Sequence, residues 1–259
     1  MYEDFYGLKE KPFTIQPDPD FLFFGKRHSM AYSMLEYGIQ NRAGFSVICG
    51  EIGCGKTTLV RHLLNNVDSD VTVGIVYNTH QKVDDLLGWI MLAFEQPYEG
   101  LSEIALFDAF QQFLISSYVA GRRVVLIVDE AQNLSPGALE SLRMLSNINA
   151  DKDQLLQIIL VGQPQLRDLL RKPELQQFCQ RVAVDFFIPP LLANEISKYI
   201  AHRLKVAGRE SPLFTQPAIW HIAKATKGIP RSINILCDMA LVYGFSSGAK
   251  RISKKLVEE

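Results

Sequence analysis

The sequence predicts an α/β core built on a five-stranded parallel sheet, followed by a small all-helical lid. Up to residue 190, apolar strand-like segments without polar alternation are each followed by a helical segment, which is typical of a parallel sheet covered on both faces. After Pro189 and Pro190 only helical patterns remain, so we expect the core to end there. The chain of 259 residues is 47% hydrophobic and 21% charged, which favours a folded globular protein over a disordered one.

The elements follow from local patterns, such as the capping serine and first-turn proline of Ser135 and Pro136. Short apolar strands are expected at residues 45–49, 71–77, 123–128, 155–161 and 182–188. Core helices are expected at 28–40, 56–65, 84–94, 103–119, 135–147, 164–170 and 173–180, and lid helices at 194–207, 216–226 and 230–245. The first 25 residues, rich in Phe, Pro and Asp, predict an ordered but irregular lead-in that packs its aromatic rings on a core.

Charge and cysteine content exclude several classes of protein. The net charge of −1 creates no global field that would draw the chain to nucleic acid or anionic lipid. The four cysteines include no C-x-x-C pair, which argues against zinc and is typical of reduced thiols in the cytoplasm. The sequence has no signal peptide and no apolar run of the ~18 residues that a membrane helix needs. We expect a cytoplasmic protein, and any membrane anchor of a longer parent chain would follow Glu259.

A phosphate-binding loop is predicted between the first strand and the helix after it. The segment GEIGCGKT fits the pattern G-x-x-x-x-G-K-[ST] at every position and has the expected strand–loop–helix context. The residues expected to contact nucleotide are Gly50, Glu51, Ile52, Gly53, Cys54, Gly55, Lys56, Thr57 and Thr58. In such a loop, backbone N–H groups surround the phosphates, the lysine reaches the β- and γ-phosphates, and the hydroxyl after it ligates Mg²⁺.

Two alternatives to this interpretation of the loop remain. A glycine-rich turn between a strand and a helix would have similar residues without any ligand, although a full match in this context is uncommon in such turns. Cys54 is expected to contribute only its backbone, while a redox-sensitive loop is the alternative role for its thiol.

An apolar strand at 123–128 ends in two acids, Asp129 and Glu130. Parallel sheets present functional groups at the carboxyl ends of their strands, so we expect Asp129 to hold Mg²⁺ and Glu130 to act as general base toward the attacking water. Two solvated loop acids are the alternative. The GTPase motifs D-x-x-G and N-K-x-D and an ABC-type LSGGQ segment are missing, and about 70 residues after the core are too few for a second helicase domain. The motifs therefore predict an ATPase that uses ATP and Mg²⁺.

Two polar residues at strand ends are candidates for sensing the nucleotide. Asn78 follows the second strand, where it could hydrogen-bond Glu130 and restrain it; an ordinary asparagine turn is the alternative. Gln163 ends the fourth strand, where an amide can reach the γ-phosphate and the attacking water, although Asn, Ser or Thr is more usual there.

Two arginines are candidates for contacts with phosphate. Arg181 precedes the last strand, a fixed position from which a cation can reach a neighbouring subunit's γ-phosphate; Arg171 is its rival, and a solvated helix-end arginine is the alternative. Arg231 opens a lid helix after Pro230 and could report the nucleotide state to the lid, with Lys227 as the nearby alternative.

Together these segments resemble the AAA+ ATPases of the general secretion pathway protein A family. The resemblance covers nearly the whole chain and is carried by residues 1–8 (MYEDFYGL), 11–13 (KPF), 17–19 (PDP), 129–134 (DEAQNL), 161–166 (VGQPQL), 180–182 (QRV) and 228–234 (GIPRSIN). It implies a lead-in at 1–27 that packs near the nucleotide, a P-loop AAA+ core at 28–190 and a lid at 191–259. It also implies that Phe24 and His28 lie near the adenine, although a core position for Phe24 and a helix cap for His28 are alternatives.

The resemblance further implies an oligomer with nucleotide at subunit interfaces. Members of the family help to build envelope machinery for secretion, pili or exopolysaccharide, many continuing into a membrane helix and a peptidoglycan-binding domain. The expected location becomes the cytoplasm, at the inner face of the bacterial inner membrane. One alternative is a DNA-associated transposition helper, for which the only basic group is Lys250, Arg251, Lys254 and Lys255, a pattern typical of a solvated helix face. The other is an ATP-gated scaffold with negligible turnover.

Overall fold

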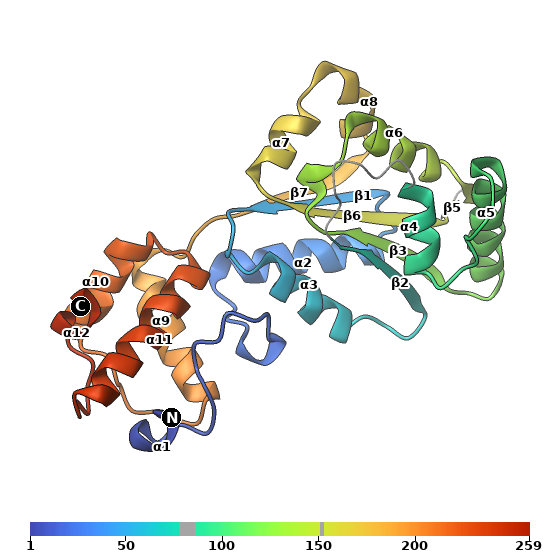
Figure 1. The fold of residues 1–259 in the computed structure, drawn as a ribbon. Helices are drawn as coiled ribbons and strands as arrows, with labels where there is room; N and C mark the ends of the chain where they lie inside the picture. Colours follow the sequence, from blue (N-terminus) through green and yellow to red (C-terminus); the bar gives the residue numbers. More distant parts are fainter. Residues whose placement is uncertain (78–85, 151–152) are drawn as a thin grey trace. The chain divides into compact units, whose positions relative to one another are not determined.

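The computed structural model describes residues 1–77, 86–150 and 153–259, and it contains a five-stranded sheet (Figure 1). The strands are β1 (Phe45–Gly50), β2 (Val71–Val76), β3 (Arg123–Val128), β6 (Leu156–Gly162) and β7 (Val182–Ile188), in the spatial order β2-β3-β6-β1-β7. The pairs β2–β3, β3–β6 and β1–β6 are parallel. The predicted α/β class with its five-stranded parallel sheet and helical lid is confirmed. A short antiparallel pair, β4 (Asn149–Ala150) with β5 (Asp153–Gln154), was not predicted.

Helices connect the strands in the alternating order that the sequence predicts. They are α2 (Lys26–Gln40), α3 (Lys56–Asn65), α4 (Leu86–Ala93), α5 (Glu103–Val119), α6 (Pro136–Leu145), α7 (Pro164–Leu170) and α8 (Gln176–Cys179), with 3-10 turns η2 (Ala131–Asn133) and η3 (Pro173–Leu175). Serine side chains cap two of them: Ser102 Oγ accepts from the N–H of Ala105, and Ser135 Oγ accepts from that of Ala138.

The central strands β1, β3 and β6 are buried on both faces, which explains why they lack polar alternation, while the edge strands β2 and β7 are partly exposed. Successive strand residues point to opposite faces, and one set, including Val47, Leu126 and Ile158, joins a core with apolar residues of α4 to α8. Residues of the other set, including Ile127 and Ile159, are also buried. Figure 1 shows α2 on one side of the sheet and α6, α7 and α8 on the other.

The chain forms two compact units, which we describe separately. The sheet unit contains Met30–Gly50 and Leu63–Phe187, and the loop–lid unit contains Met1–Ser29, Glu51–His62 and Ile188–Glu259. The phosphate loop therefore groups with the lid helices rather than with the strand that precedes it. The predicted boundaries at residues 27 and 190 divide the chain by sequence order and stay a prediction.

Aromatic residues of the lead-in complete the core of the lid. The lid helices are α9 (Ala193–Val206), α10 (Gln216–Thr226), α11 (Pro230–Ser246) and α12 (Lys254–Glu258), and the lead-in contributes α1 (Glu3–Tyr6) and η1 (Pro19–Phe21). The ring of Phe13 meets that of Phe214 edge to face at 5.8 Å, and the Tyr6 hydroxyl donates to the carbonyl of Ala249 at 3.1 Å. Lead-in and lid thus share one hydrophobic core.

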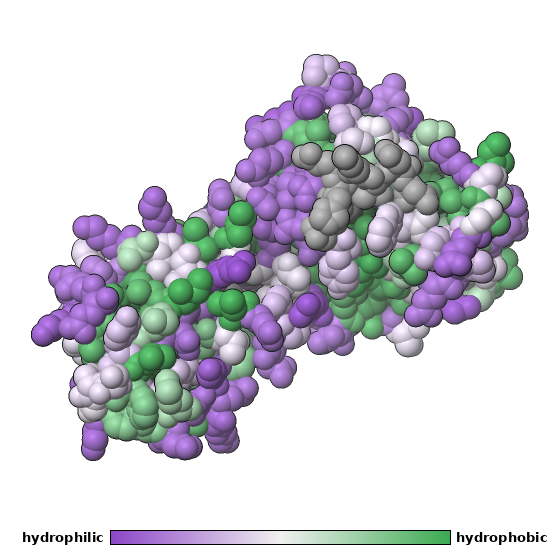
Figure 2. All heavy atoms as spheres, in the orientation of Figure 1, coloured by the Kyte–Doolittle hydropathy of each residue, from purple (hydrophilic) through white to green (hydrophobic). Residues whose placement is uncertain are grey.

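One exposed stripe on the lid is apolar. Ile235, Met239 and Tyr243 are 49%, 44% and 44% exposed, and their spacing of four residues places them on one face of α11. Figure 2 shows hydrophobic patches among polar ones over the lid helices on the face drawn. Within the described residues, no helix is both long and apolar enough to cross a bilayer.

A glycine between α10 and α11 gives a first prediction. Gly228 has φ +79°, and a Cβ there would lie 2.1 Å from the carbonyl oxygen of Leu191. We expect Gly228→Ala to lower the free energy of unfolding of the loop–lid unit by more than the ~1–3 kcal/mol of left-handed strain alone. Gly248→Ala is the control, because Gly248 has φ +69° with nothing within 4 Å of its Cβ position. Urea unfolding measures both, and equal losses would contradict the role of the Leu191 contact.

Candidate active site

The phosphate loop contains two glycines in the left-handed conformation, just before the start of α3. Gly53 and Gly55 have φ of +80° and +88°, which residues with a Cβ adopt only at a cost. Helix α3 begins at Lys56, so its first N–H groups and its positive dipole end face the loop. Lys56 is 7% exposed, and its Nζ donates to the carbonyl of Glu51 at 3.0 Å across the loop. This donor set, followed by the hydroxyls of Thr57 and Thr58, fits a polyphosphate.

The first turn of α11 packs directly on this loop. The N–H of Arg231 donates to the carbonyl of Gly53 at 3.1 Å, and a Cβ on Gly53 would lie 2.5 Å from Cβ of Arg231. Position 53 therefore needs glycine for its conformation and for the close approach. Arg231 therefore lies at the loop, and its side chain is exposed. The alternative candidate, Lys227, is the C-cap residue of α10 and has a left-handed backbone conformation.

A buried histidine holds the other side of the loop. His28 is 4% exposed, and its Nε2 lies 2.8 Å from the carbonyl oxygen of Cys54, which makes Nε2–H the donor. Burial lowers the pKa of His28 below its ordinary value of 6.5. Burial also raises the pKa of the Cys54 thiol to about 11, so the thiol stays protonated near neutral pH. This favours a purely backbone role for Cys54 over a redox-sensitive one.

The depressed pKa of His28 predicts that acid destabilises the fold. Below pH 6.5 the unfolded chain binds a proton at His28 that the folded chain does not, so the free energy of unfolding falls as the pH is lowered from 6.5 toward the folded-state pKa. One such proton contributes up to about 1.4 kcal/mol per pH unit. We expect His28→Gln, which keeps a donor for Cys54, to flatten this dependence in urea unfolding between pH 7 and 5. His202, whose pKa burial also lowers, would contribute to the remaining slope; an unchanged slope would contradict the assignment to His28.

The predicted carboxylate pair lies at the carboxyl end of β3, in the sheet unit. Asp129 is 9% exposed, and its Oδ1 accepts from the N–H of Glu130 at 2.9 Å. Glu130 has φ +54°, a left-handed conformation that is uncommon for a residue other than glycine. A left-handed backbone at a residue other than glycine costs about 1–3 kcal/mol, and Arg42, Glu95 and Lys227 share this conformation with Glu130.

Two amides orient the carboxylate of Glu130. Strands β3 and β6 are neighbours in register, Val128 beside Leu160, so the turn after β3 lies beside the end of β6. Gln163 Nε2 donates to Glu130 Oε2 at 3.0 Å, and Gln132 Nε2 donates to the same oxygen at 2.5 Å. The sequence predicts Gln163 as a contact for the γ-phosphate and the attacking water, and Asn78 as the partner of Glu130, so neither amide contact to Glu130 was predicted. Gln132 was missed altogether, and its only signal is an amide two residues after the acid pair.

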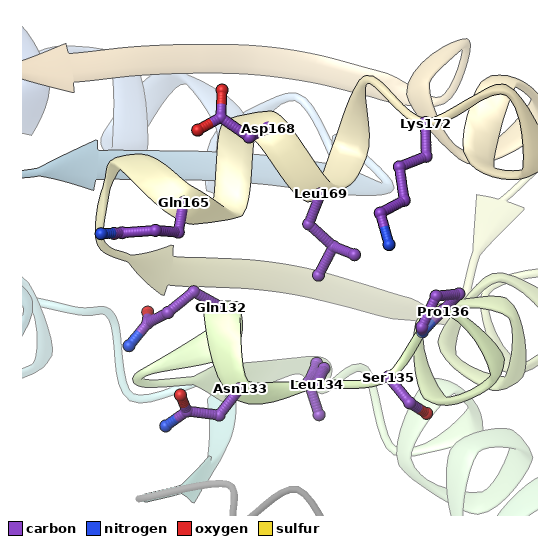
Figure 3. Close-up of a pocket in the computed structure, with 9 residues that line it drawn as sticks. All are labelled: Gln132, Asn133, Leu134, Ser135, Pro136, Gln165, Asp168, Leu169 and Lys172. Atoms are coloured by element: carbon purple, nitrogen blue, oxygen red, sulfur yellow. The ribbon is translucent and has the colours of Figure 1, made fainter.

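Gln132 also lines one end of a groove of about 470 Å³ on the sheet unit (Figure 3). Its lining residues are Gln132, Asn133, Leu134, Ser135, Pro136, Gln165, Asp168, Leu169 and Lys172. Figure 3 shows Gln132 and Gln165 at the end nearest the strand arrowheads, and Pro136 and Lys172 at the other end. Leu134 and Leu169 lie between these two ends.

The remaining candidates are placed individually. Arg181 is half-buried just before β7, and its Nη1 donates to Ser146 Oγ at 3.2 Å. Its rival Arg171 is 77% exposed in its side chain and lies 3.9 Å from Asp168. Asn78 lies outside the described residues. The candidate Mg²⁺ ligands Thr57 and Asp129 belong to the loop–lid unit and the sheet unit respectively.

The class of protein follows from the fold, the loop and comparison with known families. The family model of the AAA domain matches residues 39–170, and the chain belongs to this family. It is 40% identical over 253 residues to general secretion pathway protein A of Aeromonas hydrophila, which confirms the predicted resemblance. The match covers 97% of this chain but only 46% of that relative, so the chain spans less than half of the relative's length.

Solved structures share the fold. The ADP form of the Aeropyrum pernix ORC2 protein has a TM-score of 0.67 at 18% identity, covering 90% of this chain and 66% of that one. Cdc6p from Pyrobaculum aerophilum has a TM-score of 0.67 at 18% identity, covering 91% of this chain and 68% of that one. At these identities the likeness extends to the fold alone.

Proposed function

We propose that the protein binds Mg-ATP at the phosphate loop and hydrolyses it to ADP and phosphate. Binding is supported by the loop's two left-handed glycines, the start of α3 and the nearly buried Lys56. Hydrolysis is supported by one observation above all: Glu130 sits in a strained conformation at a strand end with two amides on one carboxylate oxygen. A carboxylate held this firmly can orient a water molecule as general base.

The other residues take complementary roles in this proposal. Thr57 and Asp129 hold Mg²⁺, which neutralises phosphate charge when bound. Lys56 contacts the β- and γ-phosphates, Gln163 reports the γ-phosphate to Glu130, and Arg231 carries the nucleotide state to α11. Asn78 belongs to the same proposal as a restraint on Glu130.

We propose further that active sites form between copies of the chain, with Arg181 supplying a cation to its neighbour. The exposed stripe of Ile235, Met239 and Tyr243 supports self-association, because assembly would remove an apolar surface from water. In this proposal, ATP hydrolysis drives or gates the assembly of envelope secretion or exopolysaccharide machinery at the inner face of the bacterial inner membrane. The identity with general secretion pathway protein A supports this process.

The proposal predicts that ATP turnover per subunit rises with protein concentration. A lone subunit lacks the neighbour's arginine, so its activity is low until copies associate. Turnover is measured against concentration, and light-scattering mass is measured on Glu130→Gln with and without Mg-ATP. Mass should increase with Mg-ATP, because an uncleaved nucleotide keeps the interface closed.

Other outcomes would indicate other functions. Steady turnover by a monomer would contradict the shared site. Assembly with Mg-ATP but no turnover by the unmodified chain would indicate an ATP-gated scaffold. Salt-dependent DNA binding would indicate the DNA-associated alternative. Against that alternative, Lys254 Nζ is 3.1 Å from the Glu258 carboxylate, as expected for a solvated helix face.

A further inference from the structure

We propose that Gln132 is a positioning residue, which ties the carboxylate of Glu130 to the end of β6 and so sets the rate of hydrolysis. This inference rests on the proposed ATPase function, and it adds Gln132 as a residue that controls the orientation of Glu130. Gln132 does not contact ATP in this role; it acts through Glu130.

The Gln132 side chain uses both ends of its amide. Its Nε2 donates to Glu130 Oε2 at 2.5 Å, and its Oε1 accepts from the backbone N–H of Gln163 at 2.9 Å. The glutamine amide offers a donor and an acceptor on one planar group. Glutamate would place a second acceptor against the carboxylate, and leucine would provide neither bond.

The surrounding backbone makes room for this bridge. A Cβ on Gly162 would lie 2.9 Å from Gln132 Oε1, a distance that real Cβ contacts essentially never show. Gln132 itself is held in the 3-10 turn η2, directly after Glu130. The glycine that ends β6 therefore leaves the space into which this amide reaches.

The Gln132 amide connects the proposed general base, Glu130, to the proposed γ-phosphate sensor, Gln163. Gln163 meets Glu130 through its side chain and Gln132 through its backbone, so a movement of the end of β6 reaches the carboxylate by two routes. Both amides bond the same oxygen, Oε2, and therefore orient the carboxylate about a common point. Gln132 also lines the groove of Figure 3. A molecule that binds in this groove and moves Gln132 would therefore disturb its hydrogen bond to Glu130 directly.

The test compares two glutamines of the same groove. Gln132→Leu removes both bonds, whereas Gln165→Leu changes an exposed glutamine at the same end of the groove that takes no part in them. We expect Gln132→Leu to lower kcat about 10–100-fold, the loss expected for a hydrogen bond to a charged group. ATP affinity, measured by nucleotide binding, should stay unchanged, and Gln165→Leu should match the unmodified chain. Gln132→Glu, which keeps the size of the side chain, should also lose kcat.

A double-mutant cycle separates positioning from a general structural effect. In the Glu130→Gln background, Gln132→Leu should cause no further loss, because the group it orients is already gone. A full loss in both backgrounds, or equal kcat for Gln132→Leu and Gln165→Leu, would overturn the inference while leaving the ATPase proposal in place. Absence of turnover in the unmodified chain would instead refute the ATPase proposal and this inference with it.

Discussion

Replacing Glu130 by glutamine is expected to lower ATP turnover by about 10²–10⁴-fold, the usual contribution of a general base. The amide has the same size but cannot accept a proton from water. ATP binding should be unchanged, because Glu130 is proposed to act on the attacking water and is not among the proposed contacts to the nucleotide. Steady-state turnover and nucleotide binding on the same preparation measure the two effects.

Glu99→Gln is the matched control for this change. Glu99 is an exposed carboxylate in the turn between α4 and α5. Its turnover should equal that of the unmodified chain. Retained activity in Glu130→Gln would refute the general-base assignment and redirect attention to Asp129.

Arg181→Ala is expected to lower turnover by about 10³–10⁵-fold, the contribution of an arginine finger to phosphoryl transfer. The loss should come with little change in ATP binding, because the proposed contact is made to a neighbour's nucleotide. Arg171→Ala should remain active, since that rival side chain is largely exposed. An inactive Arg171→Ala with an active Arg181→Ala would exchange the two assignments.

Mixing two inactive variants distinguishes a finger from a local structural role. Subunits with Arg181→Ala retain Glu130, and subunits with Glu130→Gln retain Arg181. In a mixed assembly, the second kind can complete the site of the first, so turnover should reappear on mixing. No recovery, despite a rise in light-scattering mass with Mg-ATP, would mean that Arg181 acts within its own subunit.

The core of the fold is readable from sequence because its signals are local. The three central strands are largely apolar runs buried on both faces, and each of the five strands matches a predicted segment to within a residue or two. The spatial order of the strands was not predicted, since it depends on which strands pair across the chain. The pair β4–β5 was missed because two-residue strands are too short for any periodicity, and the same applies to the single turn of α1.

The candidate site was likewise predictable only where its residues form contiguous motifs. The phosphate loop and the acid pair are contiguous motifs, so their chemistry is visible in the sequence. The contacts of Gln132 and His28 join segments that are 31 and 26 residues apart, Gln132 to Gln163 and His28 to Cys54. No local pattern encodes such meetings, because they arise only when strands or helices pack side by side.

The grouping of the phosphate loop with the lid limits how this domain can be divided. Gly53 is bonded to the first turn of α11, and Cys54 to a residue of the first 29. A fragment trimmed to the sheet would keep the GKT motif but lose both supports of its backbone. A fragment that keeps the proposed nucleotide binding must therefore retain His28 and the first turn of α11, and deletions that remove either support are expected to abolish binding before they touch the motif itself.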